Sequence, residues 1–417
     1  MPPPLSHPLL DQLEKTLRRP LSHFLLLLAF ALAFYGYSLS FGFVYDDAVL
    51  LRSNPWHWLH TPWANPIYYR PLQAVLFDPH LVSRSALLLH FQNVVVGTLV
   101  IFLFGRLLGS LGFGTYLTLL IELAGVVLPS SLMLFAWISQ RTEWPVDILG
   151  LLLALWTTTS RPRAPVYLVV FLLFSVLALL AKESGITLLL LAPALLVVSR
   201  RAYAQAIGAV LIGAVLFAGF WVLRAHVVGQ NSSSWLGLFD LMVVGGFGLL
   251  EALLYLLVPV CFTASYLYLG LGATFGAMAL LGLGWMWRQD RRRAATLLWV
   301  AASFAIGAAG CPEPRNLVVP GLVTAALACD ATARVMEFDW GWGRKAALAL
   351  LLIVNLCAFA STSVLSSYAL QDWVETINSK LERLEPGRTR RGNLHEIDVN
   401  TRVRVDLRAR IMKLLGS

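Results

Sequence analysis

Long apolar runs separated by short polar gaps dominate this sequence. A helix that crosses a bilayer needs about 20 predominantly apolar residues, and run after run approaches that length. The pattern therefore predicts an all-α polytopic membrane protein with about 11 transmembrane helices. We expect these spans at residues 21–40, 86–105, 113–135, 145–160, 166–181, 184–199, 204–223, 269–287, 295–309, 317–332 and 346–366.

Residues 241–262 are also apolar enough to cross the membrane, but the sequence favours another arrangement for them. A Gly-Gly pair at 245–246 and Pro259 interrupt the run. A crossing here would also move the basic group Arg288–Arg293 to the other side of the membrane. We therefore expect a re-entrant or interfacial helix in this segment.

The distribution of charge orients the predicted helices. The chain is 58% hydrophobic and 13% charged, with a formal net charge of +9, whereas soluble domains carry about 25% charged residues. Its basic residues gather in alternate gaps, as the positive-inside rule expects of cytoplasmic loops. The clusters are Lys15/Arg18/Arg19, Arg161/Arg163, Arg200/Arg201, Arg288/Arg291/Arg292/Arg293 and Arg334/Arg344/Lys345. This distribution places the N-terminus in the cytoplasm and the C-terminus outside. Because the topology of the helices accounts for the positive charge, we expect no nucleic-acid partner.

Two parts of the chain follow from this pattern. Residues 1–367 form a transmembrane domain, and residues 368–417 form a small extracytoplasmic tail. Within the domain, residues 42–85 make the first extracytoplasmic loop, whose Trp and Tyr residues suit short interfacial helices. The four cysteines show neither paired nor metal-type spacing, so we expect no disulfide framework and no zinc site.

Candidate chemistry gathers on the side opposite the basic clusters. Asp46 and Asp47 directly follow the first span, at the water edge of the bilayer. Polar groups at membrane depth are expensive, commonly pair with one another and are usually functional. A two-sided transporter would place such groups near the midplane, so the one-sided clustering favours a reaction or binding site at the outer leaflet. The other candidates on this side are Tyr69, Arg70, His90, Asn93, Arg141, Glu143, Lys182, Glu183 and Arg315.

These residue types suit the transfer of a group from a lipid phosphate. A carboxylate can deprotonate an acceptor hydroxyl, and Arg or Lys side chains can neutralise the departing phosphate. Charge pairing at a partly desolvated boundary is stronger than in water, so a few cations suffice. The aromatic side chains of the first loop can hold a sugar by stacking.

Six short motifs in colinear order resemble a known family. They read YDD, YRPL, HxxN, WISxRxE, KExGIT and RxLxxP, at Val44–Asp47, Tyr69–Leu72, His90–Asn93, Trp137–Glu143, Lys182–Thr187 and Arg315–Pro320. In this order they resemble the polyprenyl-phosphate-dependent glycosyltransferases of the GT-C fold. The resemblance is closest to the transmembrane O-mannosyltransferases that carry tetratricopeptide repeats, and to their bacterial relatives. It covers about residues 20–330, and this sequence shows no such repeats.

The resemblance implies an inverting transfer of a hexose from a polyprenyl-phosphate donor on the luminal or periplasmic side. Asp46 would be the general base, with Asp47 beside it, and Arg70 and His90 would line the site near the acceptor or the donor. A polar segment with an acid is common in the family where this chain reads Ser130-Ser131-Leu132-Met133. The donor phosphate would be held by Lys182, Glu183, Arg315 and Arg141, and the other expected substrate contacts are Tyr69, Asn93 and Glu143.

Several candidates also have a purely structural interpretation. The two aspartates can cap an interfacial helix, and Arg70 can extend to lipid headgroups. Lys182 and Glu183 can be solvated residues of a tight turn that Gly185 permits. Each of these interpretations places the side chain in water or among lipids.

For the remaining candidates the alternative is a contact within the bundle or at its surface. His90 and Asn93 lie one helical turn apart, so a hydrogen bond between helices explains them as well as a substrate contact does. Arg141 can be a surface arginine, and on a regular helix it would not face Glu143, two positions later. Arg315 can terminate a helix, although its outward position against the charge rule favours phosphate binding.

Two other function classes stay open at this point. One is a flippase or transporter for a lipid-linked sugar, and the other is a non-catalytic membrane subunit that presents substrate to a partner. The aspartate pair with His57, His60 or His90 has ligand types suited to a divalent ion. Because no spaced ligand motif accompanies them, we expect no required metal or cofactor.

The expected partners are the polyprenyl-phosphate-linked sugar, membrane lipids and an acceptor that is a protein, a glycan or a lipid. Short loops favour a multi-pass protein of a bacterial inner membrane, with its site facing the periplasm. The sequon at Asn231 keeps the endoplasmic reticulum membrane open. The sequence identifies neither the donor sugar nor the acceptor.

Overall fold

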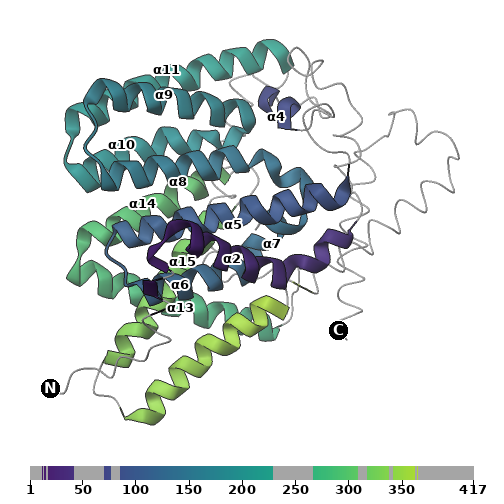
Figure 1. Cartoon of the computed structure of the whole chain (residues 1–417). Coiled ribbons are helices and arrows are strands. Elements are labelled where there is room, and N and C mark those ends of the chain that lie inside the picture. The colour runs from purple at the N-terminus through teal and green to yellow at the C-terminus, as the bar shows by residue number, and fades with distance from the viewer. Residues whose placement is uncertain are drawn as a thin grey trace, which may run out of the picture.

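The computed structural model is a bundle of helices that run broadly parallel and antiparallel to one another (Figure 1). Almost all of its described residues are helical, and none of them forms a strand. The described residues are 12, 14–15, 17–41, 70–76, 85–228, 266–308, 317–337, 341–361 and 364.

Seven helices in these ranges are long and apolar enough to cross a membrane, and the count is eight if the bent pair α6–α7 is one span. The prediction of an all-α polytopic membrane protein is thereby confirmed. Each of the eleven predicted spans coincides with a helix or a helix pair, but eleven crossings stay a prediction.

The elements are α2 Pro20–Tyr35, η1 Gly36–Ser40, α4 Pro71–Leu76, α5 Ala86–Ser110, α6 Thr115–Val127, α7 Pro129–Ala136, η3 Ile138–Thr142, α8 Trp144–Thr159, α9 Ala164–Ala181, η4 Glu183–Gly185, α10 Ile186–Arg200, α11 Tyr203–Val228, α13 Tyr266–Gln289, α14 Arg291–Ala308 and α15 Val318–Glu337, followed by the helix Trp342–Ser361.

Burial separates the inner helices of the bundle from the outer ones. In α15, 78% of the apolar window is buried, against 17% in α11 and in the helix Trp342–Ser361. An apolar helix with so little of its surface buried presents most of its side chains to lipid. These two helices therefore lie on the outside, whereas α15 packs against α6, α13 and α14.

Proline explains why the predicted span 113–135 is broken in the structure. The axes of α6 and α7 differ by 74°, because the residue before Pro129 is disfavoured in helical conformation and Pro129 has no N–H to donate. The carbonyl groups freed by the break find other donors. Ser131 Oγ donates to Gly125 O at 2.7 Å, and the hydroxyl of Tyr35 donates to Val126 O at 2.9 Å.

Hydrogen bonds tie the helices together at two opposite ends. At the first, which we call the Arg-rich end, Arg200 donates to the carbonyl of Thr157, Arg292 to that of Ser199 and Arg293 to that of Leu111. Cations are favourable beside the carbonyl groups that end a helix. This end joins the last residues of α5, α8 and α10 to the start of α14.

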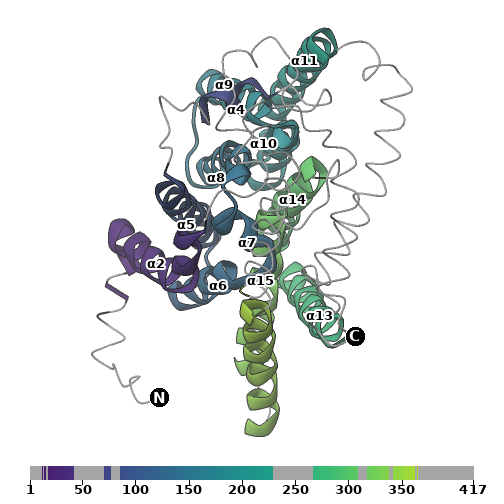
Figure 2. The ribbon, with the colours of Figure 1, turned by 90° about the vertical axis from the view of Figure 1, so that its right-hand side faces the viewer.

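The opposite end, which we call the Lys182 end, joins the starts of α5, α8 and α10 to the ends of α9 and α14. Here the backbones approach closely: a Cβ atom on Gly307 of α14 would lie 2.8 Å from Ser184 O. Figure 2 shows the bundle from this end, with α4 lying across α9. From α5 to α10, successive helices run in alternating directions between the two ends, as the predicted order of membrane crossings requires.

A buried acid–histidine pair links α2 to α6 within the bundle. His23 Nε2 lies 2.6 Å from Glu122 Oε2, and both side chains are almost fully enclosed. A Cβ atom on Gly105 of α5 would lie 1.8 Å from Glu122 Oε1, so glycine is needed for α5 to pass this pair. Neither residue belongs to the predicted site, although Glu122 carries a signal in the sequence, because it is an isolated acid in an apolar run.

The break between α6 and α7 gives a first prediction. The variant Tyr35→Phe keeps the ring, which stacks on Phe135 at 4.5 Å, but leaves Val126 O without this donor. We expect a loss of about 1–3 kcal/mol in the free energy of unfolding, measured by steric trapping or by denaturation in mixed micelles. Tyr203→Phe, at an exposed position, is the control and should change stability by less than about 0.5 kcal/mol. An equal effect of both substitutions would contradict this account of the break.

Candidate functional site

The turn between α9 and α10 is held tightly by packing. Lys182 is extended, with φ −161° and ψ 153°, and η4 follows it directly. A Cβ atom on Gly185 would lie 2.4 Å from the backbone carbon of Ala178. Gly185 has φ −55°, so glycine is required here for space and not for a left-handed conformation. The sequence of the turn thus fixes where Lys182, Glu183 and Ser184 point.

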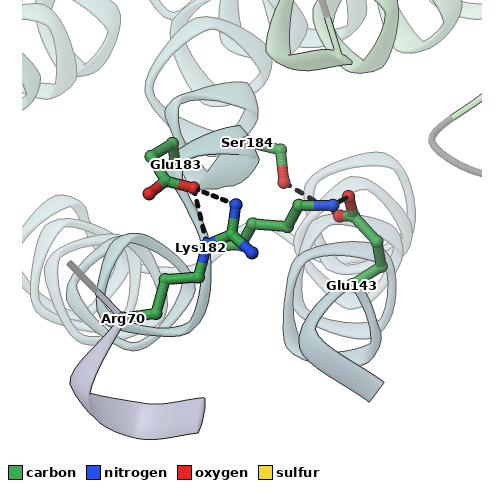
Figure 3. Close-up of polar contacts among 5 residues, drawn as sticks. All are labelled: Arg70, Glu143, Lys182, Glu183 and Ser184. Atoms are coloured by element: carbon green, nitrogen blue, oxygen red, sulfur yellow. Dashed lines mark hydrogen bonds and ion pairs between the residues drawn. The ribbon is translucent and has the colours of Figure 1, made fainter. Parts of the chain in front are cut away.

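Lys182 and Ser184 both reach the carboxylate of Glu143, which lies between η3 and α8 (Figure 3). Lys182 Nζ forms an ion pair with Glu143 Oε1, and Ser184 Oγ donates to Glu143 Oε2 at 2.8 Å. The side chains of Lys182 and Glu143 are only 12% and 6% exposed. The interpretation of Lys182 as a solvated turn residue is therefore wrong, because it is a buried partner of a remote segment.

Arg70 connects the first loop to the same turn. Its Nε and Nη2 atoms lie 2.8 Å and 2.7 Å from Glu183 Oε2, and its side chain is 12% exposed. Arg70 immediately precedes α4, which packs against α9 and η3. In this arrangement Arg70 is directed into the protein rather than towards lipid headgroups, and two N–H groups on one carboxylate make a strong, oriented contact.

Asp147 is a functional candidate that the sequence analysis missed. It lies in the first turn of α8, is almost fully buried and interacts electrostatically with Glu143 and Lys182. Its spacing of four residues from Glu143 places the two carboxylates on one side of the chain. Its position at the edge of an apolar run is the feature of the sequence that could have identified Asp147 as a candidate.

Two further candidates, Asn93 and His90, lie in α5 and contact other segments of the chain. Asn93 Nδ2 donates to Trp137 O at 2.7 Å, which is the interhelical hydrogen bond of the structural alternative. His90 is fully buried and its ring packs edge-on against Phe41, with centroids 6.1 Å apart. The bond of Asn93 holds the start of η3 against α5, and a role of either residue in substrate binding stays a prediction.

Arg141 also faces α5, not the lipid. Its Nη2 atom donates to Leu89 O at 3.0 Å and to Gln92 Oε1 at 2.8 Å, and its guanidinium lies 4.9 Å from the centroid of the Trp144 ring. Arg141 and Glu143 therefore leave η3 in different directions, one towards α5 and the other towards Lys182. The surface interpretation of Arg141 is wrong, since it is almost fully buried.

The structure therefore brings seven of the predicted site residues to the Lys182 end. They are Arg70, His90, Asn93, Arg141, Glu143, Lys182 and Glu183. Asp46, Asp47, Tyr69 and Arg315 lie outside the described residues, as do segment 241–262 and the tail 368–417. Among the side chains that the structure describes, no group of three or more His, Cys, Asp or Glu residues could hold a metal ion.

Buried polar atoms at this end remain available for a ligand. Glu183 Oε1, Trp144 Nε1 and Thr187 Oγ1 have no hydrogen-bond partner among the described residues. Such groups are costly unless a water or a ligand satisfies them. Lys182 and Arg70 can exchange their internal ion pairs for contacts with an anion, to which Trp144 Nε1 and Thr187 Oγ1 can also donate, whereas Glu183 Oε1 can accept from a sugar hydroxyl or a water.

The arrangement around Lys182 gives a second prediction. Glu143→Gln keeps the shape of the side chain but removes its charge, and Asp147 remains as a second acid near Lys182. We expect a loss of about 1–2 kcal/mol in the free energy of unfolding from Glu143→Gln. The double variant Glu143→Gln/Asp147→Asn should lose about 3–5 kcal/mol, because it leaves a buried lysine without an acid. Steric trapping measures these values, and additivity of the single changes within about 0.5 kcal/mol would exclude a shared role.

Comparison with known proteins adds no identification to this geometry. No family model, no curated protein and no solved structure matches the chain. The residues that meet at the Lys182 end are therefore the features of the described structure that indicate a function.

Proposed function

We propose that this protein is a membrane glycosyltransferase with a GT-C-like fold of about 11 spans. It moves a hexose from a polyprenyl-phosphate donor to an acceptor hydroxyl, with inversion at the anomeric carbon. The observation that carries the proposal is the direct contact of three remote segments at one end of an apolar bundle: Arg70 of the first loop, Glu143 beside η3 and the turn Lys182–Ser184.

The position of this site favours a donor that is anchored in the bilayer. The site lies at the opposite end of the bundle from the arginines that bind the carbonyls of α5, α8 and α10. The positive-inside rule assigns the Arg-rich end to the cytoplasm, so the Lys182 end faces the periplasm or lumen. A polyprenyl phosphate with its head at this interface can present its sugar to Lys182 without leaving the membrane. A bacterial inner membrane is the location that we propose.

In the proposed reaction Asp46 takes the proton of the acceptor hydroxyl. The acceptor oxygen forms a bond to the anomeric carbon while the bond from that carbon to the phosphate oxygen breaks. The electron pair leaves with the polyprenyl phosphate, whose charge Lys182 and Arg315 stabilise. Lys182 can turn from Glu143 to the phosphate while Ser184 Oγ continues to donate to the Glu143 carboxylate. No metal is required for these steps.

The role of the first-loop aspartates gives a third prediction. Asp46→Asn retains the size of the side chain but cannot accept a proton, so the transfer rate should fall about 100-fold or more. The measurement is the release of polyprenyl phosphate from labelled polyprenyl-phosphate mannose and polyprenyl-phosphate glucose by purified protein in nanodiscs. Asp47→Asn is the matched control, because adjacent side chains on an extended segment point in opposite directions. Near-normal turnover by Asp46→Asn would remove Asp46 from the mechanism, and loss only in Asp47→Asn would make Asp47 the base.

The phosphate site gives a fourth prediction. Lys182→Met should lower the rate of transfer about 100-fold, and Lys182→Arg should recover part of it because the charge is kept. Lys345→Met is the control, since Lys345 lies exposed at the Arg-rich end, where it donates to Met336 O. Movement of the labelled donor across the membrane without cleavage would instead identify a flippase. Activity that appears only with a co-purifying chain would identify a non-catalytic subunit.

A further inference from the structure

Two pairs of arginines meet where α9 and α11 begin, at the Arg-rich end. Arg161 and Arg163 precede α9, whereas Arg200 and Arg201 end α10 and lead into α11. Because α9 and α11 pack against each other and run side by side (Figure 1), the two pairs share one end of this helix pair. Arg292 joins them from the start of α14 by donating to Ser199 O.

These residues, which we call the arginine cluster (Arg161, Arg163, Arg200, Arg201 and Arg292), hold positive charge without nearby compensation. Arg161 and Arg292 lie close enough to Arg200 to repel it electrostatically. Within the part of the chain that the structure describes, no carboxylate forms a salt bridge with any member of the cluster. The nearby Asp290 accepts a hydrogen bond from the backbone N–H of Arg293 instead. An anion that binds the cluster therefore does not have to displace a carboxylate of the described residues.

Carbonyl groups hold two of these guanidiniums in place. Arg200 donates to Thr157 O and, at 3.3 Å, to Trp156 O, while Arg292 donates to Ser199 O. A guanidinium has five N–H donors, so these bonds orient the groups and leave other donors free for phosphate oxygens. Oriented guanidiniums are well suited to phosphate recognition.

Arg201 ends helix α10 with an unusual, left-handed backbone conformation. Arg201 has φ 56° and ψ 30°, and it is the one non-glycine residue with positive φ in the described ranges. Helices that end in this left-handed conformation usually have glycine there. The conformation ends α10, with the backbone N–H of Arg201 directed at Val197 O, and the exposed side chain adds a cation to the cluster.

Exposed apolar side chains continue from the cluster along both helices. Val166 and Val169 of α9 are 51% and 63% exposed, and Tyr203 and Ile207 of α11 are 60% and 62% exposed. Their spacing of three or four residues places each pair on one helix face. A basic group followed by an apolar stripe matches a molecule with an anionic head and hydrocarbon tails.

We propose that the arginine cluster binds the phosphate group of an anionic phospholipid whose acyl chains lie against α9 and α11. Basic groups between transmembrane helices recognise anionic headgroups in this way on the cytoplasmic side. The proposal is independent of glycosyl transfer, because this lipid is neither donor nor acceptor and lies at the other end of the bundle from Lys182.

Titration of the full-length protein in detergent, followed by native mass spectrometry, tests this fifth prediction. Phosphatidylglycerol should bind more tightly than phosphatidylcholine. The double variant Arg161→Gln/Arg201→Asn should weaken phosphatidylglycerol binding about 25-fold, since each arginine near the surface is worth about fivefold. Asparagine tolerates the left-handed conformation, and both changed side chains are exposed, so the fold should be retained. Arg161→Gln alone should give about a fivefold effect.

Arg344→Gln is the matched control, because Arg344 is also exposed and starts the helix Trp342–Ser361, away from α9 and α11. Its binding of phosphatidylglycerol should equal that of the unchanged protein. An equal loss in Arg344→Gln would show that only the overall charge matters, and unchanged binding by the double variant would exclude the cluster. Complete displacement of phosphatidylglycerol by an equal concentration of inorganic phosphate would assign the cluster to a soluble phosphate. Each of these three outcomes would overturn the proposal.

Discussion

The geometry of the Lys182 end depends on the ion pair between Lys182 and Glu143. It joins the turn after α9 to the segment that precedes α8, and Ser184 strengthens the link from the same turn. A charge enclosed by protein and lipid is costly alone, so each member of the pair requires the other or a substitute ion. For Lys182 the substitute partner can be a phosphate or the nearby acid Asp147, and Glu143 keeps the hydrogen bond from Ser184 Oγ. The same constraint that holds the turn together therefore allows an anionic ligand to compete for it.

The break at Pro129 determines how this pair can form. Because α7 leaves the direction of α6, the segment from Trp137 to Glu143 meets α5 and the turn after α9 instead of continuing a straight crossing. Asn93 and Arg141 hold this segment against α5, which leaves Glu143 directed towards Lys182. Residues that we selected as substrate contacts thus have a defined structural task, whether or not they also touch a substrate.

Much of the fold was accessible from the sequence because apolar length and basic gaps are strong, local signals. They predicted the helices, their alternating direction and the gathering of polar residues at one end. The pairing of these residues was not accessible, since Lys182 and Glu143 are separated by 39 positions and no local rule joins them. The surface alternatives for Arg70 and Arg141 were wrong, because their side chains are largely enclosed and their partners, Glu183 and Gln92, lie in other segments. Asp147 and Glu122 were missed because each is a single acid in an apolar run and belongs to no recognisable motif.

Helix α14 has a mechanical consequence for how the protein fits its membrane. It is attached at one end through Arg292 and Arg293 to the carbonyls of α10 and α5, and Gly307 packs on the turn of Ser184 and Thr187 at its other end. With 18 residues it is roughly 27 Å long, and this length sets the separation between the Arg-rich end and the Lys182 end of the bundle. A helix attached at both ends cannot tilt independently to follow a thicker or thinner bilayer. The surrounding lipid must therefore stretch or compress to match the protein, which sets a preferred membrane thickness for it.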